Sequence, residues 1–378
     1  MPSIGTREIV AAVRVLSSGQ LARYGPGASE TRRFEAELCQ KVGVKYALGV
    51  NSGTSALICA LVGAGIGPGD EVLVPGYTWL STAAAPLAVG AIPVLVDIDL
   101  SLTMDPNDII RKITPRTKAI IPVHMLNLVC DMDKIMEIAN GHGLMVIEDA
   151  SQAVGGVYKG RRVGSIGHAG AFSFTQHKNI KSGEGGALVT NNERLYVRAA
   201  MYHDVGSYTR EDSYQSEEPL LVGVNLRMPE LAAAILRPQL RRIDAQLSRR
   251  RKRRRLIINE LRRSALSPTV SPHNDPYSAA AITVYFDDPN VALSFASSRG
   301  VTRLIDTDRH VYTNWQSILG RRSAHPALDP YRWAACDAGI TPEGGLATLE
   351  ILKRTCTFNL LPEVPMPAFR MLVRRMVK

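Results

Sequence analysis

The sequence contains few cysteines, and none of them has the spacing of a disulfide framework or a zinc site. The five are odd in number and irregularly spaced, and no C-x-x-C pair occurs among Cys39, Cys59, Cys130, Cys336 and Cys356. This pattern argues against both kinds of cross-link and fits a reducing compartment. We therefore expect neither structural disulfides nor a metal centre.

Long hydrophobic runs are also missing. The longest apolar stretch, residues 83–96, is interrupted by Pro86, Gly90 and Pro93 and is too short to span a bilayer. Residues 1–19 lack the charged start, the apolar block and the cleavage site of a signal peptide. We therefore expect a cytoplasmic protein with no membrane partner.

Acidic residues are fewer than basic ones. The chain has 35 aspartates and glutamates and 45 lysines and arginines, which gives a formal net charge of +10. Much of the excess lies in one run, RRRKRRR at residues 249–255, inside a helical pattern. Such a run can bind an acidic partner, such as nucleic acid or a phosphorylated substrate, or it can form a solvated helix face. No nucleic-acid motif accompanies the run, so we favour the solvated face and expect no nucleic-acid partner.

Short apolar runs alternate with helical patterns through the first half of the chain. The runs predict strands at residues 46–50, 71–74, 92–96, 119–123, 144–147, 171–174 and 187–190. Helical patterns lie between them, for example at residues 55–62, 131–140 and 193–200. This alternation predicts an α/β fold with a mostly parallel seven-stranded sheet that is covered on both faces.

The later part of the chain is less regular. A single long helical pattern covers residues 229–262, and a strand-like run at 282–286 and a terminal helix from Pro367 follow it. The length of 378 residues suggests two or three domains. We predict a large domain at residues 1–245 and a smaller C-terminal α/β domain at residues 246–378.

Ligands of open α/β sheets bind at the carboxyl ends of the strands, so the residues that follow each predicted strand are candidates for a site. Asn51–Ser55 follows the first strand and opens a helix, where exposed N–H groups can bind a phosphate. Serine and threonine also cap helices that bind nothing, and for this segment alone we favour capping. Trp79 follows the second strand and can either stack on a flat ring or pack in the core.

Two further strand ends carry ionisable side chains. Asp149 follows the strand at 144–147, where a buried carboxylate needs a partner such as a protonated pyridine nitrogen, a helix N-terminus or an arginine. Lys178 follows the strand at 171–174, and a desolvated lysine there can form an imine with an aldehyde. By spacing alone Lys181 is equally available, and simple solvent exposure is the alternative for either lysine. The combination of the four strand ends is a far more specific indication of a ligand site than any one of them.

These residues lie in strings that identify a family. The chain resembles the sugar aminotransferases of the DegT/DnrJ/EryC1/StrS family, which use pyridoxal 5'-phosphate (PLP) and belong to the aspartate-aminotransferase fold superfamily. The resemblance covers residues 5–260 and rests on NSGTSAL (51–57), GDEVLVPGYTW (69–79), ITPRTKAIIPVH (113–124), VIEDASQAVGG (146–156), FSFTQHKNIKSGEGGALVTN (172–191) and VNLRMPELAAAI (224–235). It implies the PLP-dependent transferase fold, fold type I.

The resemblance also implies residue roles. Lys178, not Lys181, occupies the Schiff-base position, Asp149 faces the pyridine nitrogen, Gln152 lies near the ring hydroxyl and Trp79 stacks on the ring. The implied residues around the phosphate are Gly53, Thr54, Ser55 and Ser173. Asn225 resembles a residue that reaches the phosphate from a neighbouring subunit, which implies a homodimer with shared active sites.

The implied activity is transfer of an amino group from glutamate or glutamine to a keto-sugar, nucleotide-linked or free, or to a keto-cyclitol. Such reactions serve amino-sugar, antibiotic or surface-polysaccharide biosynthesis. Two alternatives stay open: a PLP-dependent sugar dehydratase, and a non-catalytic regulatory protein of the same fold. The sequence departs from the family pattern at Asn127, at His168 and over residues 310–333, so we expect an altered substrate pocket with unchanged cofactor chemistry.

Overall fold

A computed structural model describes residues 4–23, 29–206, 218–261, 263, 269–270, 274, 281–298, 300–332, 339–358 and 364–376. Cys336 and Trp333 lie outside the described residues. Cys39, Cys59, Cys130 and Cys356 are free thiols. Among the helices described, none is both long enough and apolar enough to cross a membrane.

The centre of the described chain is a seven-stranded sheet with the order β1-β9-β8-β5-β4-β2-β3. Its strands are β1 (Tyr46–Val50), β2 (Glu71–Pro75), β3 (Ile92–Val96), β4 (Thr117–Ile120), β5 (Met145–Asp149), β8 (Ala169–Ser173) and β9 (Gly186–Thr190). Strand β9 runs antiparallel to both β1 and β8, and the other pairings are parallel. The carboxyl ends of β1, β2, β5 and β8 therefore meet at one edge of the sheet.

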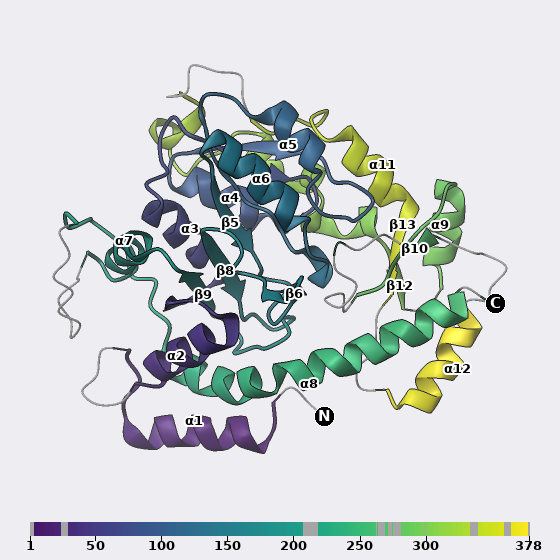
Figure 1. Ribbon diagram of the computed structural model, residues 1–378, viewed down its shortest axis with the longest axis horizontal. Helices are drawn as coiled ribbons and strands as arrows, with labels where there is room; N and C mark the ends of the chain where they lie inside the picture. The colour runs from purple at the N-terminus through teal and green to yellow at the C-terminus, as the bar shows by residue number, and fades with distance from the viewer. Residues whose placement is uncertain are drawn as a thin grey trace.

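Helices cover both faces of this sheet, as expected for strands that are apolar on both sides. One face packs on α2 (Glu30–Val42), α5 (Pro106–Lys112), α6 (Met132–His142) and α8 (Glu230–Leu261). The opposite face packs on α3 (Gly53–Gly63), α4 (Ser81–Ala88) and α7 (Glu193–His203). The result is a three-layer sandwich, seen at the left of Figure 1.

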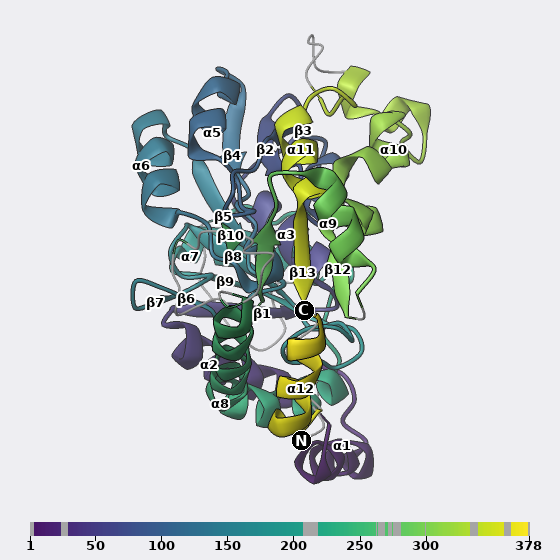
Figure 2. The same cartoon turned by 90° about the vertical axis from the view of Figure 1, so that its right-hand side faces the viewer.

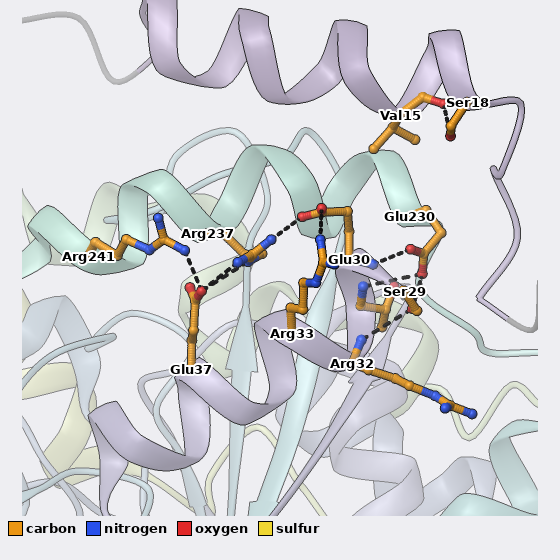
Figure 3. A network of polar contacts seen from close by, with 11 residues as sticks. Val15, Ser18, Ser29, Glu30, Arg32, Arg33, Glu37, Glu230, Arg237 and Arg241 are labelled. Atoms are coloured by element: carbon orange, nitrogen blue, oxygen red, sulfur yellow. Dashed lines mark hydrogen bonds and ion pairs between the residues drawn. The ribbon is translucent and has the colours of Figure 1, made fainter. Parts of the chain in front are cut away.

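Helix α8 runs along one side of the molecule, from α1 (Thr6–Ser18) and α2 to the C-terminal part (Figure 1). Its first residue, Glu230, is buried and accepts hydrogen bonds from the Ser29 hydroxyl and from the backbone N–H groups of Glu30 and Thr31. A carboxylate here satisfies free N–H donors at the positive end of α2. Figure 3 shows this contact beside the ion pairs of Arg237 with Glu30 and Glu37.

The C-terminal part builds a second, antiparallel sheet in the order β10-β11-β13-β12. Its strands are β10 (Thr269–Val270), β11 (Thr283–Tyr285), β12 (Val301–Arg303) and β13 (Thr355–Phe358). Figure 2 shows this sheet beside α9 (Pro289–Ala296) and α11 (Leu346–Arg354). A separate apolar cluster joins it to the end of α8 and to α12 (Met366–Met376).

The segment between β12 and α11 packs differently, because it returns to the large sheet. Tyr312, Trp315 and Ile318, from a short 3-10 turn and α10 (Gln316–Leu319), belong to the same apolar cluster as α3 and α4. Smaller elements complete the fold: the hairpin β6 (Val157–Tyr158) and β7 (Arg161–Arg162). The predicted fold class is confirmed, whereas the domain division at residue 245, which lies inside the continuous helix α8, stays a prediction.

Candidate active site

A cavity of about 810 Å³ lies at the carboxyl edge of the large sheet, between the strand ends and the C-terminal segment. Its walls include Gly53, Thr54, Trp79, Asp149, Gln152, Ser173 and Lys178, which are seven of the nine residues that the sequence singled out. Ser55 and Asn225 do not line it. The strand ends form one wall, and Ala281, Thr302, His310, Thr357 and Phe358 contribute to the other.

The turn from β1 into α3 opens on this cavity. Ser52 caps α3, since its hydroxyl accepts the Ser55 N–H, and the Ser55 hydroxyl in turn donates to Asn51 over 2.6 Å. Ser55 therefore serves the cap, while Gly53 and Thr54 face the cavity. A Cβ at Gly53 would approach the Ser173 Cβ to 2.7 Å, so only glycine leaves this space open. Small residues and free helix N–H groups form a cradle suited to an anion.

Asp149 ends β5 and is buried at this edge, with 4% of its surface exposed. Its Oδ2 accepts a hydrogen bond of 2.8 Å from Thr82, whose hydroxyl is also bonded to Thr78. Its Oδ1 accepts the Ser151 N–H at 3.1 Å. These neutral donors hold the carboxylate in place, and within the described part of the chain no cationic group makes a hydrogen bond to it. Such a carboxylate can stabilise a cation brought by a ligand.

Glu148, which precedes Asp149, binds a backbone loop and a histidine instead of lining the cavity. Glu148 is fully buried and accepts from the backbone N–H groups of Gly164, Ile166 and Gly167. It also contacts the Nε2 of His124 at 2.9 Å. The Nδ1 of His124 accepts the Cys130 N–H, so the ring proton lies on Nε2 and points to Glu148. Glu148 therefore fixes the backbone from which Asp149 projects.

Gln152 and Asn127 lie on the same side of the cavity. The Gln152 Oε1 accepts the Leu126 N–H at 3.1 Å, which leaves the Nε2 hydrogens to donate into the cavity. Leu126 and Asn127 both have left-handed backbones, with φ of 53° and 64°. This unusual turn brings Asn127 into the cavity wall, whereas His168 lies elsewhere and accepts the Val146 N–H.

Lys178 follows β8 and lines the cavity, whereas the side chain of Lys181 does not. Burial lowers the pKa of Lys178 below its ordinary value, and the nearby Asp149 charge partly opposes that change. A lowered pKa increases the share of uncharged amine, which is the form that attacks a carbonyl. The sequence alone could not separate the two lysines, and the cavity separates them.

Helix α8 holds the loop that carries Lys178. Gln239 makes two hydrogen bonds to the backbone of Lys181, at 3.1 and 2.8 Å. About two and three turns further along α8, Gln246 donates to the Asn179 carbonyl and Arg250 donates to the Asn179 side chain. The spacing of these three α8 residues puts them on one helix face. The loop position is therefore fixed from a region that sequence reasoning had not linked to the site.

Trp79 lies at the cavity mouth with 40% of its surface exposed. Its ring packs on His310 at 5.1 Å between centroids, and the Arg309 guanidinium lies 5.7 Å from the same ring. The His310 Nδ1–H donates to the Thr307 carbonyl at 3.0 Å, so Nε2 is left as an acceptor. Burial, and then the Lys178 charge, lower the pKa of His310, which keeps the ring neutral near pH 7.

His310 was missed because it lies in a loop of short 3-10 turns, which carries no local signal for a site. Two backbone hydrogen bonds tie its segment to the residues that follow β2 and bring it to the cavity. The Thr78 N–H donates to the His310 carbonyl, and the Tyr312 N–H donates to the Gly76 carbonyl. These pairs are more than 200 residues apart in the sequence. The departure from the family pattern over residues 310–333 was the available hint.

Asn225 lies outside the cavity and is exposed, and its side chain accepts the Arg227 N–H at 3.3 Å. Arg227 forms an ion pair with Asp204, and the His203 Nδ1 contacts the Ala200 carbonyl. Tyr202 is part of an apolar cluster. This surface therefore serves the structure of its own chain, and a role for Asn225 at an active site needs a second chain.

The fold is that of the PLP-dependent transferases. Residues 2–295 match the model of the DegT/DnrJ/EryC1/StrS aminotransferase family, and the chain belongs to this family. It is 44% identical over 218 residues to the GDP-perosamine synthase of Caulobacter vibrioides, covering 57% of this chain and 58% of that protein. It is 39% identical over 267 residues to the L-glutamine:2-deoxy-scyllo-inosose aminotransferase of Streptoalloteichus tenebrarius, covering 68% and 62%.

The matched region thus spans about three fifths of the length of each of these curated relatives. A solved structure of S. venezuelae DesV covers more, namely 98% of this chain and 94% of that protein, with 33% identity and a TM-score of 0.78. The family resemblance that the sequence motifs indicated is confirmed.

Proposed function

We propose that this chain is a PLP-dependent aminotransferase that moves an amino group from glutamate or glutamine to a keto-sugar or keto-cyclitol. The observation that carries the proposal is the meeting of Lys178, Asp149 and the Gly53 cradle in one cavity. Relatives with similar sequences are named for transfer to a sugar or an inosose, which supports this substrate class.

The residues present fit PLP. The cradle of Gly53, Thr54 and Ser173 suits its phosphate, and the buried Asp149 carboxylate suits its protonated ring nitrogen. Gln152 offers amide hydrogens to the ring hydroxyl. Bound PLP would supply an electron sink for the bonds at the donor's α-carbon.

The chemistry of the protein itself centres on Lys178. Its amine would first bind the cofactor aldehyde covalently and then, once displaced by the donor, carry a proton to and from the reacting carbon. The lowered pKa of Lys178 suits both tasks, because each needs the uncharged amine for part of the cycle. Asp149 would keep the ring nitrogen protonated, and Trp79 would limit the entry of water over the ring.

Borohydride trapping tests this assignment. We expect reduction of the PLP-treated protein to fix the cofactor on the peptide that contains Lys178. Lys178→Ala should lose the visible band and turnover, whereas Lys181→Ala should keep both, since only Lys178 lines the cavity. Full transamination by Lys178→Ala, or a label on another side chain, would refute the proposal.

A sugar dehydratase remains the second candidate of this fold. In the relatives that eliminate water, the family pattern replaces the Schiff-base lysine, often by histidine, and Lys178 is present here. Conversion of bound PLP to its amino form by added glutamate or glutamine favours the aminotransferase. A non-catalytic regulatory role would leave the protein without bound PLP.

We also propose a homodimer in which Asn225 completes the site of the neighbouring chain. The exposed position of Asn225, away from its own cavity, supports this arrangement. Nearby Leu220, Val222 and Val224 are exposed apolar residues, as is common in surfaces that pair with another chain. The division into domains at residue 245 and a cytoplasmic location complete the proposal.

A further inference from the structure

Arg250 is the one side chain of the arginine-rich run that lines the cavity. The run does not form a simple solvated face, since Arg253 donates to the Val364 carbonyl and Arg254 to the Ala281 carbonyl. Arg249 and Lys252, by contrast, are exposed. The inward-pointing arginines therefore need a separate explanation.

The partners of Arg250 leave its charge uncompensated. Its Nη1 donates to the Asn179 side-chain oxygen, which is a neutral group, and Asn179 itself is buried. Among the residues that the structure describes, Arg250 has no carboxylate partner. Burial lowers the pKa of this guanidinium. A half-buried cation with only an amide partner is costly unless a ligand supplies the anion.

The other charges of the cavity do not balance Arg250. Its wall has two carboxylates, of which Asp149 lies close enough to affect the pKa of Lys178 and Glu184 is exposed. The C-terminal wall offers only neutral groups, such as Thr302 and Thr357. A substrate that enters beside Lys178 therefore meets a cation whose geometry suits two oxygens of one acid group.

We infer that Arg250 binds an oxyanion of a substrate, either the carboxylate of the amino donor or a phosphate of the keto acceptor. This inference rests on the proposed function, because it assigns the substrates to the same cavity. It also gives the positive charge of the run a specific role at one position.

The test compares the PLP-treated protein with Arg250→Gln, in which the charge is removed and an amide donor remains for Asn179. Arg249→Gln removes the same charge from the exposed face one residue away and serves as the matched control. The probes are glutarate, a dicarboxylate without an amino group, and inorganic pyrophosphate, each titrated by calorimetry.

We expect Arg250→Gln to weaken binding of one probe by about tenfold or more, the usual scale for a lost charge-assisted hydrogen bond, and Arg249→Gln to leave binding unchanged. Loss of glutarate binding assigns the oxyanion to the donor, and loss of pyrophosphate binding assigns it to the acceptor. Equal binding by Arg250→Gln and the unaltered protein, or no binding of either probe, would overturn the inference.

A purely structural role for the contact is tested separately. Asn179→Ala removes the hydrogen bond to Arg250 and keeps the charge, so it should retain most of the probe binding. If Asn179→Ala weakens probe binding as much as Arg250→Gln does, Arg250 acts only by holding the loop in place and the inference is wrong. Absorbance of bound PLP is recorded in parallel: a colourless protein that still binds anions through Arg250 refutes the proposed function and supports this inference.

Discussion

Single side chains at this site are tuned by their neighbours, and Lys178 is the clearest case. Burial lowers its pKa, and the negative charge of Asp149 raises it in part. Removing that charge removes the opposing effect and disfavours the protonated amine.

We therefore expect Asp149→Asn to lower the pKa of Lys178 further, because the charge that opposes the effect of burial is removed. Without PLP, the pH at which Lys178 is half labelled by a small acylating reagent should move down, as measured by mass spectrometry. Labelling of Lys181 provides the internal control and should not change. An upward movement, or none, would show that the two groups do not interact.

Gly53 lies where an added side chain would fill the proposed phosphate cradle. A Cβ there would meet the Ser173 Cβ at 2.7 Å and the Ser151 hydroxyl at 3.2 Å. Overpacking of this size costs about 1–3 kcal/mol, so Gly53→Ala should weaken PLP binding by about fivefold or more. Gly141→Ala, where no atom lies within 4 Å of the added carbon, should leave PLP affinity unaltered in the same equilibrium titration.

At the scale of elements, we expect the contact between Glu230 and the N-terminus of α2 to stabilise the folded chain. Three donors converge on this buried carboxylate. Glu230→Gln turns one acceptor oxygen into a donor facing other donors, which should cost about 2 kcal/mol of the free energy of unfolding. Urea denaturation measures the change. Glu137→Gln, an exposed change on α6, should stay within about 0.5 kcal/mol, and an equal effect of both would contradict the capping role.

The elements of the large sheet could be predicted because each strand is a short apolar run between turn residues. The observed bounds differ by up to three residues, as for β4, which was expected at residues 119–123 and lies at Thr117–Ile120. The long helix α8 and the strand β11 were also predicted. The strands β10, β12 and β13 were not, because two to four residues carry too little periodicity.

The residues of the site also divide into those that the sequence predicts and those that it does not. Residues at the ends of predicted strands, such as Asp149 and Lys178, could be predicted since parallel strands bring their ends to one edge. His310 and Arg250 could not be, because they reach the cavity through contacts between distant segments. The role of Ser55 at the phosphate stays a prediction from the motif, and in the described chain its hydroxyl donates to Asn51.

At the scale of the whole molecule, the proposed shared site predicts complementation between two inactive variants. Lys178→Ala and Asn225→Ala each damage one half of every site in a pure dimer. In a mixed dimer one site receives both substitutions and the other receives neither. After unfolding and refolding an equal mixture, we expect about a quarter of the original activity, as random pairing of two-fold dimers gives. Activity no higher than the sum of the separate variants would mean that each chain builds its own site.

The continuity of α8 has a consequence for how such enzymes can diverge. Gln239 and Gln246 hold the lysine loop, whereas Arg253 and Arg254 hold segments after residue 280. A recombination event with its crossover just beyond Arg250 would thus keep all the contacts of α8 to the lysine loop and import a new opposite wall. If the proposed activity holds, exchange of the C-terminal coding region alone would change the acceptor and leave the residues that hold Lys178 unchanged.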